Sequence, residues 1–184
     1  MKRIFLLFSM LFVLFSCNNS NEIEKIETLS YFTNARNFKL YSITYSNGFT
    51  EALHKSELGK IDNYQTNIRN SLIDSIKKIC RNKCDENFIF KKPKDIWYCG
   101  DLHSVKITFK NGKNLFFNYP FANEQNRQFI PFLSLFREIR KDSLQATRID
   151  IGQIGNLILN QEKMSELAFK NDSIFYLKYF KKVN

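Results

Sequence analysis

Two short segments of the chain carry the same pattern, and they restrict the fold more than any other feature. Residues 42–48 read Ser-Ile-Thr-Tyr-Ser-Asn-Gly, and residues 106–112 read Lys-Ile-Thr-Phe-Lys-Asn-Gly. In each segment apolar and polar residues alternate up to an Asn-Gly pair, and a second β-prone run follows it. Such alternation is typical of a strand with one buried face, and Asn-Gly is typical of a hairpin turn. We therefore expect two antiparallel hairpins.

The side-chain pattern also selects the length of each turn. A two-residue loop would place Phe117 on the same face as Lys106, whereas a three-residue loop with Gly in the left-handed conformation gathers the large apolar groups on one face. The longer loop predicts three pairs in the second hairpin: Ile107 with Leu115, Val105 with Phe117, and His103 with Tyr119. In the first hairpin it pairs Tyr41 with Leu53, sets Glu51 opposite Ile43 and turns His54 outward. We predict the three-residue loop in both.

A helix candidate follows each hairpin. The first has apolar residues at helical spacing, with Asp62 or Asn63 as a cap and Asp74 placed to pair with Lys78: Tyr64, Ile68, Leu72, Ile76 and Ile79. The second covers residues 129–139 and should begin near Ile130, because Pro131 suits only a first turn. A duplicated ββα unit would explain this order, and so would chance.

These elements predict an α+β fold. Each hairpin has one apolar face, and each helix has one apolar stripe. They bury these surfaces most simply as an antiparallel sheet of about five or six strands, built from the two Asn-Gly hairpins, with both helices packed on one face. Other segments give weaker signals. We expect short strands at 87–90 and 147–151, a loop at 91–94, a short helix at 161–169 and a last strand at 173–180.

The chain begins with the layout of a secretory signal. Lys2 and Arg3 precede a nearly continuous apolar run, which a small residue and a cysteine close. The run is shorter than the roughly 20 residues that a membrane-spanning helix needs. Its end, Leu14-Phe15-Ser16-Cys17, resembles the lipobox of bacterial lipoproteins, although Phe15 is bulkier than the residue usual at its position. An uncleaved anchor and ordinary secretion are the alternatives.

The lipoprotein resemblance implies cleavage between Ser16 and Cys17 and attachment of acyl chains, such as palmitate, at Cys17. Asn18 is not the aspartate that retains enteric lipoproteins at the inner membrane, so the resemblance points to the outer membrane of a bacterium. We expect three parts: a signal peptide at 1–16, a polar tether at 17–36 and a single globular domain at 37–184.

The charge of the mature chain limits its partners. Of the 28 Lys and Arg residues, Lys2 and Arg3 leave with the signal, so 26 remain against 18 Asp and Glu. Export argues against nucleic acid as the partner of this basic chain. Anionic lipid headgroups, envelope polysaccharides and acidic proteins remain as partners, although a Lys and Arg excess can also serve solubility alone.

Three cysteines remain besides Cys17. A disulfide between Cys99 and either Cys80 or Cys84 is our main expectation in an oxidising compartment. Together with His103 the same thiols could also form a zinc site, or they could be unpaired and buried. Asp101 lies near His103, but no nucleophile motif accompanies them. We expect no metal, no cofactor and no catalytic residue.

One basic run lies beside the only tryptophan. Lys91, Lys92 and Lys94 precede Trp97, so cations and an aromatic ring could together contact an anionic or sugar ligand. The alternative is a solvated loop that Trp97 anchors to the core.

The sequence thus predicts a membrane-tethered cell-envelope lipoprotein that acts as a non-catalytic binding or interaction module. One alternative is an immunity or inhibitor lipoprotein that neutralises an envelope-acting enzyme. Another is an envelope hydrolase with an unrecognised site.

Overall fold

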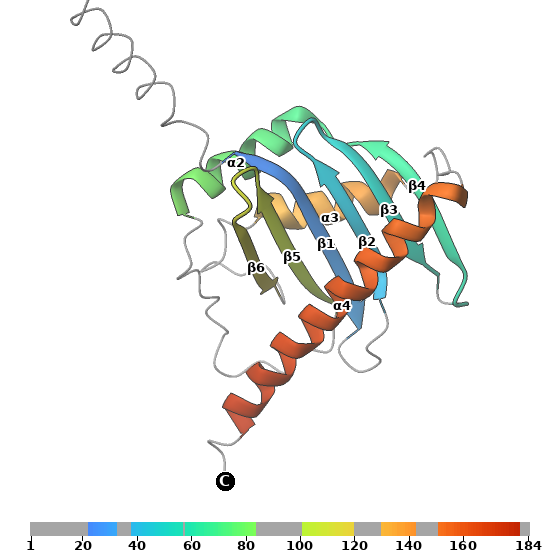
Figure 1. Ribbon diagram of the computed structural model, residues 1–184, viewed down its shortest axis with the longest axis vertical. Coiled ribbons are helices and arrows are strands. Elements are labelled where there is room, and N and C mark those ends of the chain that lie inside the picture. The colour runs from blue at the N-terminus through green and yellow to red at the C-terminus, as the bar shows by residue number, and fades with distance from the viewer. Residues whose placement is uncertain are drawn as a thin grey trace, which may run out of the picture.

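A computed structural model describes residues 22–32, 38–56, 58–83, 101–119, 130–142 and 151–180. These residues form one open antiparallel sheet and three helices, so the α+β class with an antiparallel sheet is confirmed (Figure 1). The elements in chain order are β1 (Ile23–Phe32), β2 (Phe38–Tyr45), β3 (Phe49–Lys55), β4 (Ile61–Asn67), α2 (Asn70–Lys83), β5 (Asp101–Phe109), β6 (Asn114–Tyr119), α3 (Ile130–Asp142) and α4 (Ile151–Phe180).

The first strand lies in the middle of the sheet. The strand order is β4-β3-β2-β1-β5-β6, so β1 pairs with β2 on one side and with β5 on the other. We expected residues 23–32 to belong to a polar tether, and the structure differs. Ile26 is buried on one face, and Leu29 and Tyr31 are buried on the other. A strand covered on both faces lacks the alternation that marks a half-buried strand.

The two hairpins have the registers that the side-chain pattern predicts. Tyr41 lies opposite Leu53 and Ile43 opposite Glu51, while His103, Val105 and Ile107 lie opposite Tyr119, Phe117 and Leu115. Gly48 and Gly112 have φ angles of 89° and 81°, the left-handed conformation that the three-residue loop needs. The duplication of a ββα unit stays a prediction.

The first helix begins later than the sequence suggests. Asp62 and Asn63, expected as caps, lie within β4, and α2 starts at Asn70. Tyr64 belongs to the same strand, and its buried hydroxyl donates to the carbonyl oxygen of Ile139 at 2.9 Å. Asp74 forms its ion pair with Lys77 (3.7 Å). In contrast, α3 begins at Ile130 as expected.

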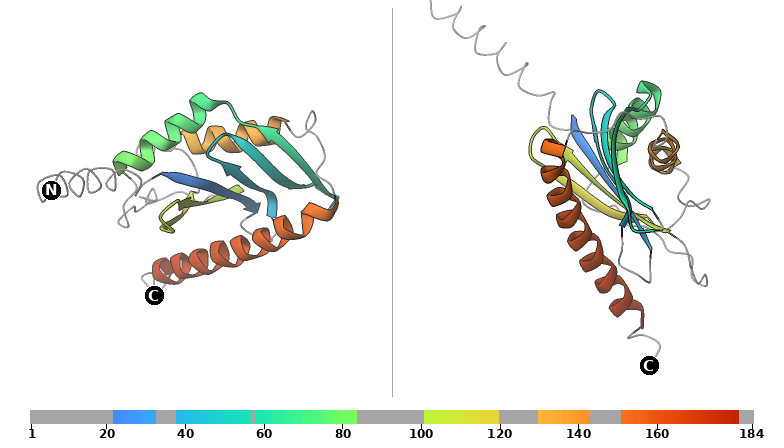
Figure 2. Two further views of the ribbon diagram at one scale, coloured as in Figure 1. Left: turned by 45° about the horizontal axis from the view of Figure 1, so that its top comes forward. Right: turned by 90° about the vertical axis from the view of Figure 1, so that its right-hand side faces the viewer.

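The C-terminal part of the described chain is one long helix. The helix predicted at 161–169 is present but forms part of the longer α4, whereas the turns predicted at Gly152 and Gly155 and the strand predicted at 173–180 are wrong, because these residues are helical too. The helix lies across the face of the sheet opposite α2 and α3 (Figure 2). The two helices expected on one face, α2 and α3, do pack together there, and α4 is a third helix that the sequence did not predict on the other face. None of the helices within the described ranges is long and apolar enough to cross a membrane.

Each face of the sheet has its own hydrophobic core. Between the sheet and the α2–α3 layer lie Ile26, Val105, Ile107, Phe117, Ile76, Cys80, Phe132 and Ile139, among others. Between the sheet and α4 lie Leu29, Tyr31, Tyr41, Leu53, Leu157, Met164 and Ala168, among others. The ring of Tyr31 meets that of Phe169 edge-on at 5.1 Å. A sheet packed on both sides in this way needs the third helix.

The two turn glycines give a matched test of the fold. A Cβ on Gly48 would lie 2.5 Å from the carbonyl oxygen of Ile68, whose amide donates to the Gly48 carbonyl, whereas a Cβ on Gly112 would meet nothing within 4 Å. Gly112→Ala should cost about 1 kcal/mol for its backbone conformation alone. Gly48→Ala should cost roughly 2 kcal/mol more, because the chain before α2 must shift. Equal losses in denaturant unfolding would refute this account.

His54 predicts how stability depends on pH. Its strand face is covered by α3, and burial, Arg140 and Lys39 lower the pKa of its imidazole, with Asp62 acting in the opposite direction. The unfolded chain therefore takes up the proton more readily, and stability should fall as the pH drops below about 6.5, the ordinary value. In urea unfolding at several pH values, His54→Gln should lose less stability over this range than the natural chain. A parallel loss in both proteins would show that His54 is not responsible.

Candidate functional site

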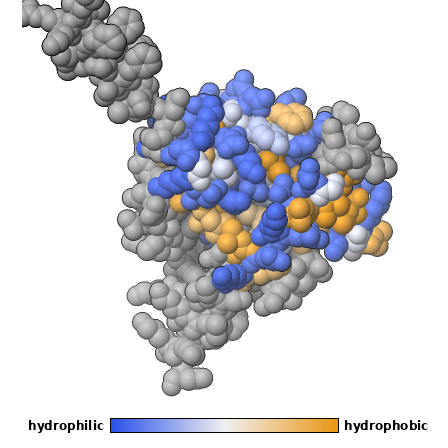
Figure 3. All heavy atoms as spheres, in the orientation of Figure 1, coloured by the Kyte–Doolittle hydropathy of each residue, from blue (hydrophilic) through white to orange (hydrophobic). Residues whose placement is uncertain are grey.

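The face of the sheet that carries α4 is only partly covered by it. The helix crosses the sheet at an angle and packs on residues toward the C-terminal end of β1 (Figure 1). Toward the start of β1 the same face carries six polar and aromatic side chains, here called the open face: Lys25, Glu27, Tyr45, Phe49, Glu51 and Lys106. In the view of Figure 3 this part of the surface is mainly hydrophilic.

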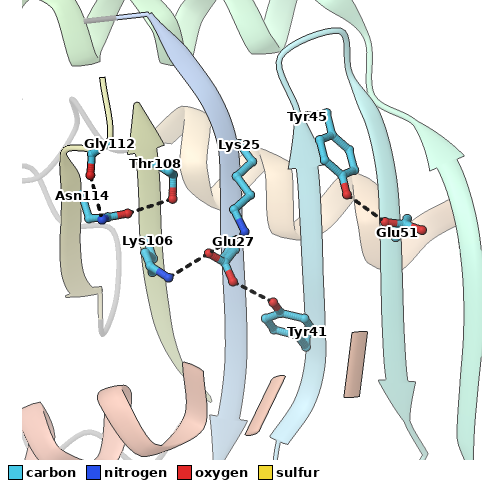
Figure 4. Close-up of polar contacts among 9 residues, drawn as sticks. All are labelled: Lys25, Glu27, Tyr41, Tyr45, Glu51, Lys106, Thr108, Gly112 and Asn114. Atoms are coloured by element: carbon cyan, nitrogen blue, oxygen red, sulfur yellow. Dashed lines mark hydrogen bonds and ion pairs between the residues drawn. The ribbon is translucent and has the colours of Figure 1, made fainter. Parts of the chain in front are cut away.

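Glu27 is the centre of the open face. It lies in the middle of β1, directly opposite Lys106 of β5, and its side chain is only 4 % exposed. One carboxylate oxygen lies 3.1 Å from the Lys106 ammonium nitrogen and 3.5 Å from that of Lys25. The other accepts a hydrogen bond of 2.9 Å from the Tyr41 hydroxyl (Figure 4). A buried carboxylate therefore has three partners from three adjacent strands.

The two lysines carry one positive charge more than the Glu27 carboxylate neutralises. Both ammonium groups form ion pairs with the buried carboxylate of Glu27. Their side chains are 26 % and 31 % exposed, so they also reach solvent. A buried carboxylate that fixes two cations restricts their rotamers, and so lowers the entropy cost of binding an anion between them. The arrangement is suited to an acidic or phosphate-bearing group.

Two tyrosine hydroxyls contact the carboxylates of the open face: Tyr45 lies on this face, and Tyr41 is buried beside Glu27. Burial, and then the charge of Glu27, raise the pKa of Tyr41 far above its usual range. Burial and Glu51 raise that of Tyr45, whose hydroxyl donates to Glu51 at 3.1 Å. Both tyrosines therefore stay neutral hydrogen-bond donors at physiological pH. The ring of Tyr45 also stacks on Phe49 at 6.0 Å, which gives the face an aromatic wall.

The contacts of Glu27 restrict the chemistry that its carboxylate can perform. Glu27 has both oxygens engaged with cations and a hydroxyl, so it is poorly placed to take a proton from a substrate. Within the described ranges, no group of three or more His, Cys, Asp or Glu residues is arranged to hold a metal ion.

The residues singled out from the sequence lie elsewhere. His103 is on the opposite face, with its ring 4.4 Å from that of Phe136, and Cys80 is buried among the residues of α2 and α3. The other candidates fall outside the described residues: Cys17, Cys84, Lys91, Lys92, Lys94, Trp97 and Cys99. The disulfide, the zinc alternative, the lipidation and the binding surface at Trp97 all stay predictions.

Sequence reasoning missed the open face because it took β1 for a tether. One signal was present. Lys25, Glu27, Leu29 and Tyr31 stand at alternating positions, and Ile26 stands between the first two, which a strand would sort onto two faces. Comparison of the chain with protein-family models, with curated proteins and with solved structures finds no match.

The Glu27 contacts can be tested by removing one hydroxyl at a time. Tyr41→Phe should destabilise the fold by about 2 kcal/mol, because a buried carboxylate loses a donor. Tyr45→Phe removes a similar bond to Glu51, but at a half-buried site, and should cost less than about 1 kcal/mol. Thermal and denaturant unfolding of both variants measure the difference. Equal effects would mean that Glu27 does not depend on Tyr41.

Proposed function

We propose that the chain is a cell-envelope lipoprotein, anchored through acylated Cys17, whose sheet domain is a non-catalytic binding module. The open face is its binding surface, and the ligand is an anionic envelope molecule or an acidic segment of a partner protein. The observation that carries this proposal is the pair of partly exposed lysines, Lys25 and Lys106, that form ion pairs with one buried carboxylate, that of Glu27.

The location rests on the sequence. Leu14-Phe15-Ser16-Cys17 resembles a lipobox, and the residue after the cysteine, Asn18, favours the outer membrane by the same resemblance. A protein held at a membrane surface meets its partner at high local concentration, so a small surface of moderate affinity suffices.

The composition of the open face supports binding of an anion. It combines two cations, the hydroxyl of Tyr45 and the Tyr45–Phe49 ring pair on one side of four neighbouring strands, β3, β2, β1 and β5. Preorganised groups of this kind, attached to a rigid sheet, are what specific recognition needs. All of these side chains stand on strands, so no loop is needed to position them.

Titration with an acidic probe peptide, polyglutamate, tests the surface. In NMR spectra of the labelled mature chain, the largest amide shifts should fall at Lys25, Glu27 and Lys106. Lys106→Gln keeps a donor but removes the charge, and it should weaken the response about fivefold to tenfold, the value of one moderately screened charge contact. Lys163→Gln on α4, an exposed lysine, is the matched control and should leave it unchanged.

A response confined to other lysines, or no response at concentrations that saturate exposed cations, would contradict the proposed surface. The anchor is tested separately by the intact mass of protein extracted from its native membranes. A chain that begins at Cys17 and is heavier by acyl groups is expected, whereas a chain that begins at Met1 would contradict the lipoprotein proposal.

A further inference from the structure

The start of β1 sets how far the domain can lie from its anchor. β1 begins at Ile23, so only residues 18–22 separate Cys17 from the central strand of the sheet. A fully extended chain spans at most about 3.6 Å per residue, so the six steps from Cys17 to Ile23 reach no further than about 22 Å. If Cys17 is acylated, as the proposed function requires, the N-terminal end of β1 lies within that distance of the lipid surface.

Several elements meet at this end of the sheet. The amide of Lys110, in the β5–β6 turn, donates to the carbonyl oxygen of Glu22 at 2.8 Å, and that of Ser46, in the β2–β3 turn, to Glu24 at 3.3 Å. The residue that precedes α2 by two positions, Ile68, donates to Gly48 of the same turn. Figure 1 shows α2 lying along this end, beside the start of β1. Both hairpin turns and α2 are thus fixed near the anchor.

The described part of this end carries more bases than acids. On α2 the side chains of Lys78 and Arg81 are exposed, and they lie on the ridge that points away from the core residues Leu72, Ile76 and Cys80. The charged residues here are Lys77, Lys78, Arg81, Lys110 and Lys113, against Glu22, Glu24 and Asp74. Two of the three acids are already paired, Glu22 with Lys110 (3.0 Å) and Asp74 with Lys77 (3.7 Å). The bases therefore exceed the acids by two, and Lys78 and Arg81 are the exposed bases that α2 contributes to this excess.

We infer that this end of the domain is a membrane-facing surface, and that Lys78 and Arg81 on α2 contact the phosphates of anionic lipid headgroups. The tether brings them within reach, and basic side chains close to an anionic bilayer are attracted to it within about a Debye length. The sheet then stands with its strands directed away from the membrane. The turn between β3 and β4, where Leu58 is 98 % exposed, lies at the far end, a strand length of about 23 Å away.

The orientation can be measured on the acylated full-length mature protein in vesicles of phosphatidylethanolamine and phosphatidylglycerol. A bioorthogonal fluorophore is placed either at Ser71, an exposed residue of α2, or at Leu58, and a nitroxide is carried on the lipid headgroup. The label at Ser71 should lose most of its fluorescence, and the label at Leu58 should lose almost none. Equal quenching, or stronger quenching at Leu58, would overturn the proposed orientation.

The headgroup contact is tested by charge reversal in the same assay. Lys78→Glu with Arg81→Glu should release α2 from the surface, so that the label at Ser71 regains most of its fluorescence. Lys163→Glu with Lys170→Glu makes the same change of net charge at two exposed positions of α4 and should have no effect. Circular dichroism checks that both variants are folded. Unchanged quenching in the α2 variant would overturn the headgroup contact.

The acyl mass on Cys17 distinguishes a wrong anchor from a wrong orientation. If the protein extracted from membranes has no acyl mass on Cys17, the proposed function falls and this inference falls with it. If the acyl mass is present and only the quenching pattern disagrees, the lipoprotein proposal stands and the orientation alone is wrong.

Discussion

The pairing of β1 on both sides holds this fold together. In the described sheet the β2–β3–β4 meander and the β5–β6 hairpin do not pair with each other, and β1 joins them by pairing with β2 over seven residues and with β5 over nine. The same strand supplies Glu27, whose carboxylate reaches Lys106 on β5 and Tyr41 on β2. The element that closes the sheet therefore also assembles the open face. A change that loosens β1 should disturb the fold and the site together.

A sheet with two apolar faces needs cover on both. Val105, Ile107 and Phe117 point to α2 and α3, while Leu29, Tyr41 and Leu53 point to α4. One helix cannot cover the whole of the second face. The side chains on this face therefore differ in polarity along the strands. Where α4 packs, the side chains are apolar and aromatic. Beyond the helix, β1 carries Lys25 and Glu27, and a buried charge is tolerated because partners surround it.

Local signals in the sequence were strong enough to predict part of this fold. The hairpin registers followed from alternation and from Asn-Gly, since a slip of one residue would have exposed Ile107 and Phe117. The start of α3 followed from Pro131. The failures have a common cause in tertiary context. β1 has apolar residues on both faces, so a simple alternation of apolar and polar residues does not run along it. The spacing of Tyr64, Ile68 and Leu72 continues by coincidence from β4 into α2. The open face depends on pairing between strands about 80 residues apart in the chain, which local periodicity does not report.

The position of β1 also determines how far an N-terminal anchor would let the domain lie from a membrane. If Cys17 carries the proposed acyl anchor, a domain that began near residue 37 could move freely above the membrane, whereas one whose central strand begins at Ile23 is held close to it. Native-state hydrogen exchange of the mature chain tests this most directly. If the account is right, the amides of Ile26 to Ser30 exchange as slowly as those of β2 and β5, the strands that flank them. Exchange at the rate of an unstructured chain, with β2 and β5 still protected, would contradict it.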